Sequence, residues 1–173
     1  MDSNKFYSFY MKGWDEPCLG IIQSIGDEWI LIKRIINDYL FDGYTFIRRK
    51  YIQKVNRDSN IIFKEKVLYA KGYIDQSLPL TICLNKLSTP LDWICEKKCV
   101  CMISPKDETL CYITSIEKIL KRYLILHAMT FEGCWETKNF KYLISEIVTI
   151  DFDNDYINSL VTYNRMYLSG KDD

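Results

Sequence analysis

Two stretches of the chain, Phe9–Ile25 (FYMKGWDEPCLGIIQSI) and Val100–Ile116 (VCMISPKDETLCYITSI), align without a gap at an offset of 91 residues. Apolar positions coincide along them, as Met11 does with Met102. A repeat of this kind constrains the architecture before any single element is assigned. We therefore predict that the chain contains one small β unit twice.

Later landmarks keep the same order in both copies. They are Phe41-Asp42-Gly43 with Phe131-Glu132-Gly133, Ile52 with Ile147, and Val67-x-Tyr69 with Val161-x-Tyr163. We expect a first unit over residues 1–72, a linker over residues 73–97 and a second unit over residues 98–173.

The composition is that of a globular protein rich in strands. Hydrophobic residues make up 48% of the chain, charged residues 27% and aromatic residues 14%, with 13 Tyr. Tyr, Ile and Phe favour strands over helices. The formal net charge is zero, so no whole-protein field attracts nucleic acid or anionic lipid.

Apolar or alternating segments between turn residues predict five strands in each unit. In the first unit they are Tyr7–Lys12, Leu19–Ile25, Trp29–Ile36, Tyr44–Ile47 and Ile61–Lys71. In the second they are Lys98–Ile103, Leu110–Ile116, Arg122–Met129, Cys134–Tyr142 and Ser145–Phe152. Asp42-Gly43 is read as a hairpin turn. The match of Ile61–Lys71 to Tyr156–Tyr163 indicates the same state, a strand, in both copies.

A short helix is predicted between the two units. Thr89 suits the N-cap, Pro90 the first helical position and Asp92 the third. Leu91 and Ile94 then lie on one apolar face. The predicted fold is mainly β, with two tandem five-stranded barrels related by internal duplication and this helix between them.

The segment Ile47–Val55 (IRRKYIQKV) resembles the second signature of the Sm-like proteins, in which an apolar residue and Arg-Gly precede two apolar residues three apart. With the preceding Gly20-x-Ile22 strand, each unit resembles an Sm-like or SH3-like small barrel. Arg49 stands at the glycine position of that signature, and the second unit has no Arg-Gly there. The resemblance implies RNA binding through this loop and assembly into rings.

The same segment begins the densest basic stretch of the chain. Its candidate nucleic-acid-binding residues are Arg48, Arg49, Lys50, Tyr51 and Arg57. Cations that track phosphates beside an aromatic ring for base stacking are what single-strand binding requires. The alternative is a charged solvent-facing side of a half-buried strand.

Other chemistry-bearing residues form no recognisable catalytic set, and we expect no enzyme, cofactor or metal. Cys95, Cys99, Cys101 and Cys111 could together hold a soft metal, but they lack the Cys-x-x-Cys spacing and are read as core thiols. The lone His127 is read as structural. The acidic run Asp151–Asp155 lacks the glycine and glutamate of a calcium loop and is read as a turn that ends a strand.

These observations lead to two functional hypotheses. The first is a non-enzymatic interaction protein of the regulator or immunity type, which binds another protein through its duplicated β surface. The alternative is a protein that binds single-stranded RNA through the basic strand of the first unit. No apolar segment has signal-peptide or membrane-spanning length, so we expect a cytoplasmic protein with no membrane partner, either a monomeric pseudo-dimer or a homodimer.

Overall fold

A computed structural model describes residues 1–74 and 82–168, which we call the first half and the second half. The first half contains β1 (Phe6–Met11), β2 (Cys18–Ile25), β3 (Trp29–Ile36), β4 (Leu40–Arg48), the 3-10 turn η1 (Arg49–Tyr51), β5 (Ile52–Asn56) and α1 (Ser59–Ala70). The second contains α2 (Ser88–Glu96), β6 (Cys101–Ser104), β7 (Tyr112–Ile119), β8 (Tyr123–Met129), β9 (Phe140–Leu143), the 3-10 turn η2 (Ile144–Glu146), β10 (Thr149–Phe152), α3 (Asp155–Tyr163) and the π-helical turn η3 (Asn164–Leu168).

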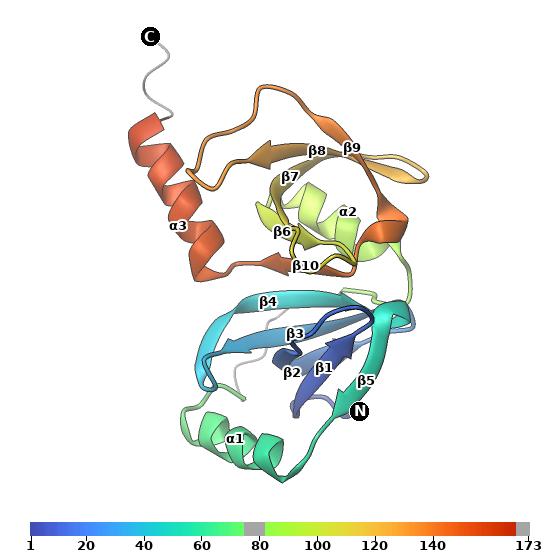
Figure 1. The fold of residues 1–173 in the computed structure, drawn as a ribbon, viewed down its shortest axis with the longest axis vertical. Coiled ribbons are helices and arrows are strands. Elements are labelled where there is room, and N and C mark those ends of the chain that lie inside the picture. The colour runs from blue at the N-terminus through green and yellow to red at the C-terminus, as the bar shows by residue number, and fades with distance from the viewer. Residues whose placement is uncertain (75–81, 169–173) are drawn as a thin grey trace.

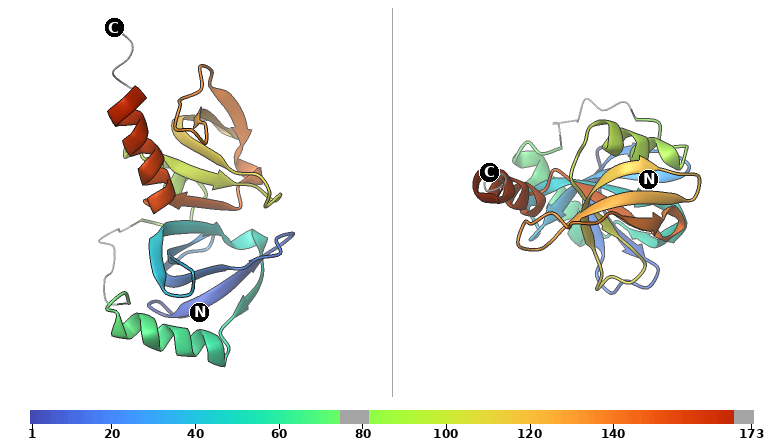
Figure 2. Two further views of the ribbon diagram at one scale, coloured as in Figure 1. Left: turned by 60° about the vertical axis from the view of Figure 1, so that its left-hand side comes forward. Right: turned by 90° about the horizontal axis from the view of Figure 1, so that it is seen from above.

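The strands form one antiparallel sheet in the order β5-β1-β2-β3-β4-β10-β6-β7-β8-β9. Figures 1 and 2 show the two halves stacked, with β4 against β10 between them. The predicted mainly β fold is confirmed. Two separate closed barrels are not formed, because hydrogen bonds between β4 and β10 continue the sheet from one half into the other.

The strand order repeats from one half to the other. In each half the fifth strand pairs with the first, and the first to fourth strands follow in sequence. A 3-10 turn joins the fourth strand to the fifth, and a helix follows the fifth strand. The register, however, differs from the ungapped alignment. A β-bulge follows Ile22 on β2 and Ile116 on β7, and these positions are 94 residues apart, not 91.

The strand predicted over Ile61–Lys71 is wrong, and so is the one over Tyr156–Tyr163. Both segments are helices, α1 and α3. The prediction that the two segments have the same secondary structure is confirmed, but that structure is a helix and not a strand. Side chains of Asp58 and Asn154 accept hydrogen bonds from backbone N–H groups three residues later, which starts each helix. A backbone capped in this way continues with hydrogen bonds along the segment, not to a neighbouring strand.

The turn between β3 and β4 also differs from the prediction. Asp42 and Gly43 lie inside β4, and the chain reverses at Asn37 and Asp38, whose φ angles are 44° and 68°. Ile36 and Leu40 pair across this three-residue connection, and Asn and Asp are the side chains that adopt the left-handed region most readily. The predicted strand Trp29–Ile36 is confirmed at both ends.

The predicted helix between the halves is confirmed as α2, but it begins earlier than expected. Its N-cap is Leu87, so Thr89 and Pro90 already lie in the first turn. The strand predicted over Cys134–Tyr142 is shorter, with β9 over Phe140–Leu143 and an isolated bridge at Trp135 before it.

One apolar core extends across the pairing of β4 and β10. It contains Tyr44 and Phe46 of β4, Ile150 and Phe152 of β10, and residues of α2. Phe46 and Phe152 stack with ring centroids 5.1 Å apart. Because the two halves share this core, we expect them to unfold together. Among the described residues, no helix is long and apolar enough to cross a membrane.

Candidate functional site

The joint between the halves, by which we mean the paired strands β4 and β10, has two different faces. Side chains alternate across a strand, so Ile150 and Phe152 enter the core while Thr149 and Asp151 point to the opposite face. On that opposite face the halves enclose a cleft of about 490 Å³. A cleft of this size falls in the range of ligand-binding pockets.

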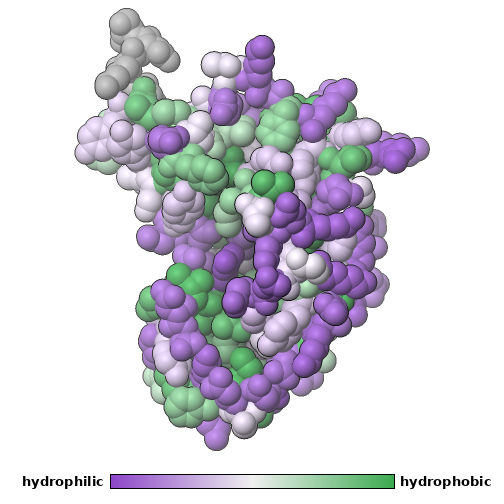
Figure 3. Space-filling view, viewed as in Figure 1, coloured by the Kyte–Doolittle hydropathy of each residue, from purple (hydrophilic) through white to green (hydrophobic). Residues whose placement is uncertain are grey.

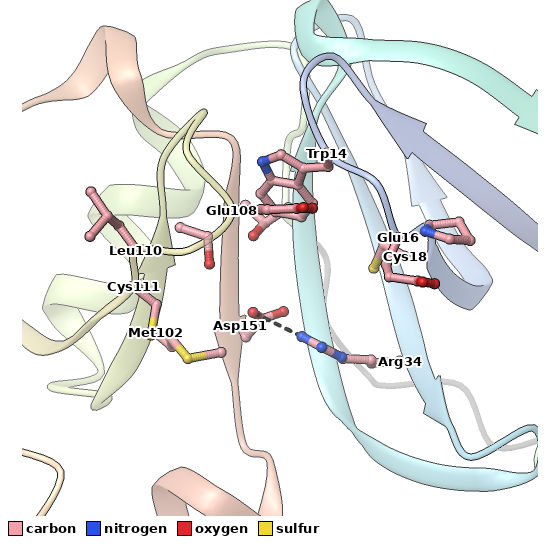
Figure 4. A pocket seen from close by; sticks show the side chains of 12 residues that line it. Trp14, Glu16, Cys18, Arg34, Met102, Glu108, Leu110, Cys111 and Asp151 are labelled. Atoms are coloured by element: carbon pink, nitrogen blue, oxygen red, sulfur yellow. Dashed lines mark ion pairs between the residues drawn. The ribbon is translucent and has the colours of Figure 1, made fainter.

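Both halves contribute to the cleft. Figure 4 shows Trp14, Glu16, Cys18 and Arg34 of the first half facing residues of the second, which include Met102, Glu108, Leu110, Cys111 and Asp151. The lining combines apolar side chains with three carboxylates, those of Glu16, Glu108 and Asp151, and one guanidinium, that of Arg34. The charged groups of the cleft are therefore predominantly acidic.

An ion pair between the halves forms the floor of the cleft. Arg34 Nη1 lies 3.0 Å from Asp151 Oδ2, and the Asp151 residue is only 2% exposed. The Thr45 hydroxyl donates a hydrogen bond to the other carboxylate oxygen. Asp151 raises the pKa of Arg34, against the opposing effect of burial. Removing one partner would leave a buried charge without compensation.

Two loops hold the outer wall of the cleft. The indole Nε1–H of Trp14 donates to the carbonyls of Pro105, at 3.2 Å, and Lys106, at 3.1 Å. The backbone N–H of Asp15 donates to Glu108 Oε2 at 2.8 Å. The β1–β2 loop and the β6–β7 loop are thereby fixed to each other, so the cleft is formed before any partner binds.

The two thiols in the cleft are poor nucleophiles. Burial raises the pKa of Cys18 to about 12, and burial also raises the pKa of Cys111. A thiol attacks as its thiolate, so both remain protonated and weakly reactive near neutral pH. Within residues 1–74 and 82–168, no three His, Cys, Asp or Glu side chains lie close enough together to hold a metal ion.

The other predicted core thiols lie on the second half. Cys101 is buried, and its pKa is raised by that burial. Cys95 is partly buried, and its thiol lies 3.3 Å from the carbonyl oxygen of Ile116. His127 on β8 stacks on Trp135, with ring centroids 4.8 Å apart, and its Nε2 lies 2.7 Å from the Glu136 carbonyl oxygen.

The predicted nucleic-acid-binding residues lie mainly at one end of the joint. Arg48 is 4% exposed, and its Nη1–H donates to the Ile144 carbonyl at 3.1 Å. The Tyr51 hydroxyl donates to the Ser145 carbonyl, and Lys50 Nζ donates to the same oxygen at 3.2 Å. Three side chains of the first half therefore hold the η2 turn of the second half.

The remaining two predicted residues have partners in the first half. Arg49 Nη1–H donates to the Gly26 carbonyl at 2.7 Å, and Arg57 Nη2 lies 3.0 Å from Glu65 Oε1. Arg57 is thus separated from the stretch at the joint by its attachment to α1. RNA binding by these residues stays a prediction, but in the structure each of them contacts the protein itself.

Of the residues that line the cleft, sequence reasoning singled out Cys111, as a core thiol, and missed the charged residues. The predicted strand Ser145–Phe152 already includes Asp151, which lies in β10, and the turn begins at Asp153, where φ is 55°. What the sequence did not indicate is that Asp151 faces a cleft and pairs with Arg34. One feature of the sequence could have indicated a functional role for Asp151, because it is a charged residue inside the apolar run Ile147–Phe152. Arg34, in the apolar strand Trp29–Ile36, was a second such signal. Their pairing joins residues more than a hundred positions apart, which spacing alone does not reveal.

Comparison of the chain with protein families, with curated proteins and with solved structures finds no match.

Proposed function

We propose that the protein is a non-enzymatic interaction protein that binds a segment of another protein in the cleft between its halves. The observation that supports this most is the cleft itself, which is preformed by two loops hydrogen-bonded to each other. Its lining is largely apolar, with the Arg34–Asp151 ion pair at the floor and the exposed carboxylates of Glu16 and Glu108 nearer to solvent. Regulators and immunity-type proteins that act by binding need such a surface and no catalytic group.

The charges of the cleft indicate the kind of segment that would fit. Glu16, Glu108 and Asp151 carry three negative charges against the one positive charge of Arg34. Complementary potentials favour binding and raise association rates, so the partner segment should be basic. The indole of Trp14 and the exposed side chain of Leu110 would contact the apolar parts of that segment.

A non-enzymatic role is supported by the state of the groups that could react. The Cys18 thiol is protonated, and His127 is not part of the cleft lining, so it cannot act there as a base for a nucleophile. The Arg34–Asp151 pair is engaged in holding the two halves together.

We further infer that the two halves derive from duplication of one five-stranded unit of the Sm-like or SH3-like kind. The repeated strand order, the two 3-10 turns and the two following helices support this origin. In this view binding belongs to the groove created between the copies and not to either copy alone.

The test is affinity capture with the full chain from nuclease-treated native lysate, followed by binding measurements with the purified partner. Glu16 is exposed, so Glu16→Arg should fold normally and weaken binding of a basic segment by about tenfold or more. Asp27→Arg, an equal charge reversal at an exposed turn outside the cleft, should leave affinity unchanged. Absence of a stoichiometric partner, or equal affinity of the Glu16→Arg variant, would refute the proposal.

A further inference from the structure

A second pocket lies at the other face of β10, separate from the cleft. It has a volume of about 350 Å³, and aromatic side chains of Tyr44, Trp93 and Phe152 line it together with residues of α3. The Phe152 ring lies 5.2 Å from the Trp93 ring and 5.6 Å from the Tyr44 ring, between centroids. We call this the aromatic pocket. Figure 3 shows hydrophobic side chains on both halves along the flank where α3 stands.

Two residues of opposite charge, Lys98 and Asp153, also line the aromatic pocket. Their φ angles are 51° and 55°, in the left-handed region that favours glycine. None of the ion pairs between described residues includes Lys98. The Asp153 carboxylate faces the pocket closely enough to help raise the pKa of Tyr44, although burial of that ring contributes more.

The backbone at Lys98 shows why this residue is unusual. It follows the C-cap Lys97 of α2, and its N–H donates to the Cys95 carbonyl while the next N–H, that of Cys99, donates to the Ile94 carbonyl. This is the position after a helix where glycine is preferred, because a side chain there strains the backbone. Lys98 therefore strains the backbone at this position, and it is one of the residues that line the aromatic pocket.

Asp153 is held in place by the neighbouring strand. Gly43 on β4 has a φ of 71°, and a Cβ there would lie 2.6 Å from backbone atoms of Asp153 and Asn154. Asp42 Oδ1 accepts a hydrogen bond from the N–H of Asp155 at 3.0 Å. The turn that presents the Asp153 carboxylate is therefore packed against β4, so the pocket wall on this side is rigid.

We propose that the aromatic pocket binds a ligand in which an aromatic ring lies next to both an amino group and a carboxylate, the chemistry of a free aromatic amino acid. The rings of the pocket would contact the ligand ring. Lys98 would pair with the ligand carboxylate and Asp153 with its amino group. The two pocket charges sum to zero, so a zwitterion fits better than a simple cation or anion.

The test is titration of the full chain with L-tryptophan, L-tyrosine and L-phenylalanine, followed by calorimetry and by the NMR signal of the Trp93 indole. L-Leucine serves as the probe without a ring. Saturable binding of an aromatic amino acid with a shift of the Trp93 signal is expected, and leucine should give none. Failure of all three aromatic probes to bind or to shift that signal would overturn the proposal.

Glycine variants separate the ligand contacts from folding. Lys98→Gly relieves a left-handed residue, so it should unfold at an unchanged or higher urea concentration. Asp153→Gly also removes the exposed hydrogen bond from Asn158 Nδ2, at 3.2 Å, so its urea midpoint should stay near that of wild type. The affinity of each variant should fall by about tenfold or more. Asn37→Gly replaces another left-handed residue by glycine outside the pocket and should keep full affinity. Wild-type affinity in both pocket variants would refute the assigned contacts.

Binding of N-acetyl-L-tryptophanamide distinguishes a free aromatic amino acid from an aromatic side chain of a partner protein. This neutral probe mimics an aromatic residue inside a protein chain. Weaker binding than that of L-tryptophan supports a free amino acid as the ligand. Equal binding would overturn that assignment in favour of a partner's aromatic side chain. The proposal does not depend on the function assigned to the cleft, because β10 separates the two sites.

Discussion

Substitution of Arg48 by Met tests whether the basic stretch holds the halves together or binds nucleic acid. Met keeps an unbranched apolar side chain at the site and removes the charge. The variant loses the hydrogen bond to the Ile144 carbonyl and the contact of the guanidinium with the Trp29 ring, whose centroid lies 5.5 Å away. It also loses the ion pair with Glu28, at 3.5 Å.

The expected change in the free energy of unfolding is estimated from each contact that Arg48→Met removes. The Ile144 carbonyl keeps the hydrogen bond from the Ile147 N–H, at 3.4 Å, but loses its charged donor, which costs about 1.5–3 kcal/mol. Loss of the cation–π contact with Trp29 costs about 0.5–2 kcal/mol. Glu28 is 43% exposed, so it regains water at little cost. The variant also removes two unfavourable features, the buried Arg48 Nε–H, which has no partner among the described residues, and the desolvated charge. Their removal offsets about 1 kcal/mol of the lost stability. We expect a net loss of about 2 kcal/mol.

Urea unfolding followed by tryptophan fluorescence measures this loss. The control is Lys50→Met, which removes an exposed hydrogen bond at the same joint and should change stability by less than about 1 kcal/mol. Binding of a single-stranded RNA oligonucleotide is measured in parallel at low and high salt. An unchanged urea midpoint for Arg48→Met, together with a salt-dependent loss of RNA affinity, would refute the structural role and favour the nucleic-acid hypothesis.

Two further perturbations test the ionic contacts. Burial opposes ionisation of Glu65, but hydrogen bonds from the Phe6 N–H and from Arg57 outweigh it, so the pKa of Glu65 is lowered in the folded state. The stability that Glu65 contributes is therefore complete above its unfolded pKa, near 4.5, and is lost as the pH falls through the lower folded pKa. The urea midpoint of wild type should fall more steeply on acidification than that of Glu65→Gln, and parallel curves would contradict this. Arg34→Met leaves the buried Asp151 carboxylate without its ion-pair partner, so the free energy of unfolding should fall by about 3 kcal/mol. The double variant Arg34→Met/Asp151→Asn should recover most of this loss. Strictly additive losses in the double variant would disprove the coupling.

The sequence predicted the strands whose pattern is local. Trp29–Ile36 is apolar along its whole length and bounded by polar turns, so its limits were predictable. The helix α1 was not recognised, because its buried face includes the charged Glu65 between Ile61 and Leu68. That carboxylate is buried only because the Phe6 N–H and Arg57 satisfy it, and these partners come from outside the helix.

The functional site was less predictable, because its contacts join distant parts of the chain. Arg48 and Lys50 look like a solvent-exposed cationic stretch until the carbonyls of Ile144 and Ser145 are placed beside them. Those carbonyls are backbone atoms, which every residue has, so no side-chain pattern marks them. Only the pairing of β4 with β10 brings the two turns together.

The contacts at the joint differ between the two halves, although both halves have the same strand order. Arg48 and Leu143 occupy equivalent places, since each lies opposite the first residue of its third strand and immediately before a 3-10 turn. Tyr51 corresponds in the same way to Glu146 at the end of the turn. Thus the side chains that hold the joint exist in the first half and are absent from the second.

This asymmetry bears on assembly. The edges of the sheet are β5, the fifth strand of the first half, and β9, the fourth strand of the second half. At the joint it is also a fourth strand, β4, that pairs with a fifth strand, β10. A second copy could add at these edges by repeating that pairing, but β9 is followed by Ile144, Ser145 and Glu146, which lack the cationic and phenolic donors of η1. We therefore infer that the pairing ends after two halves. The basic stretch lies in the first half only, so among the described residues its contacts occur at the joint and are not repeated at the outer edges of the sheet.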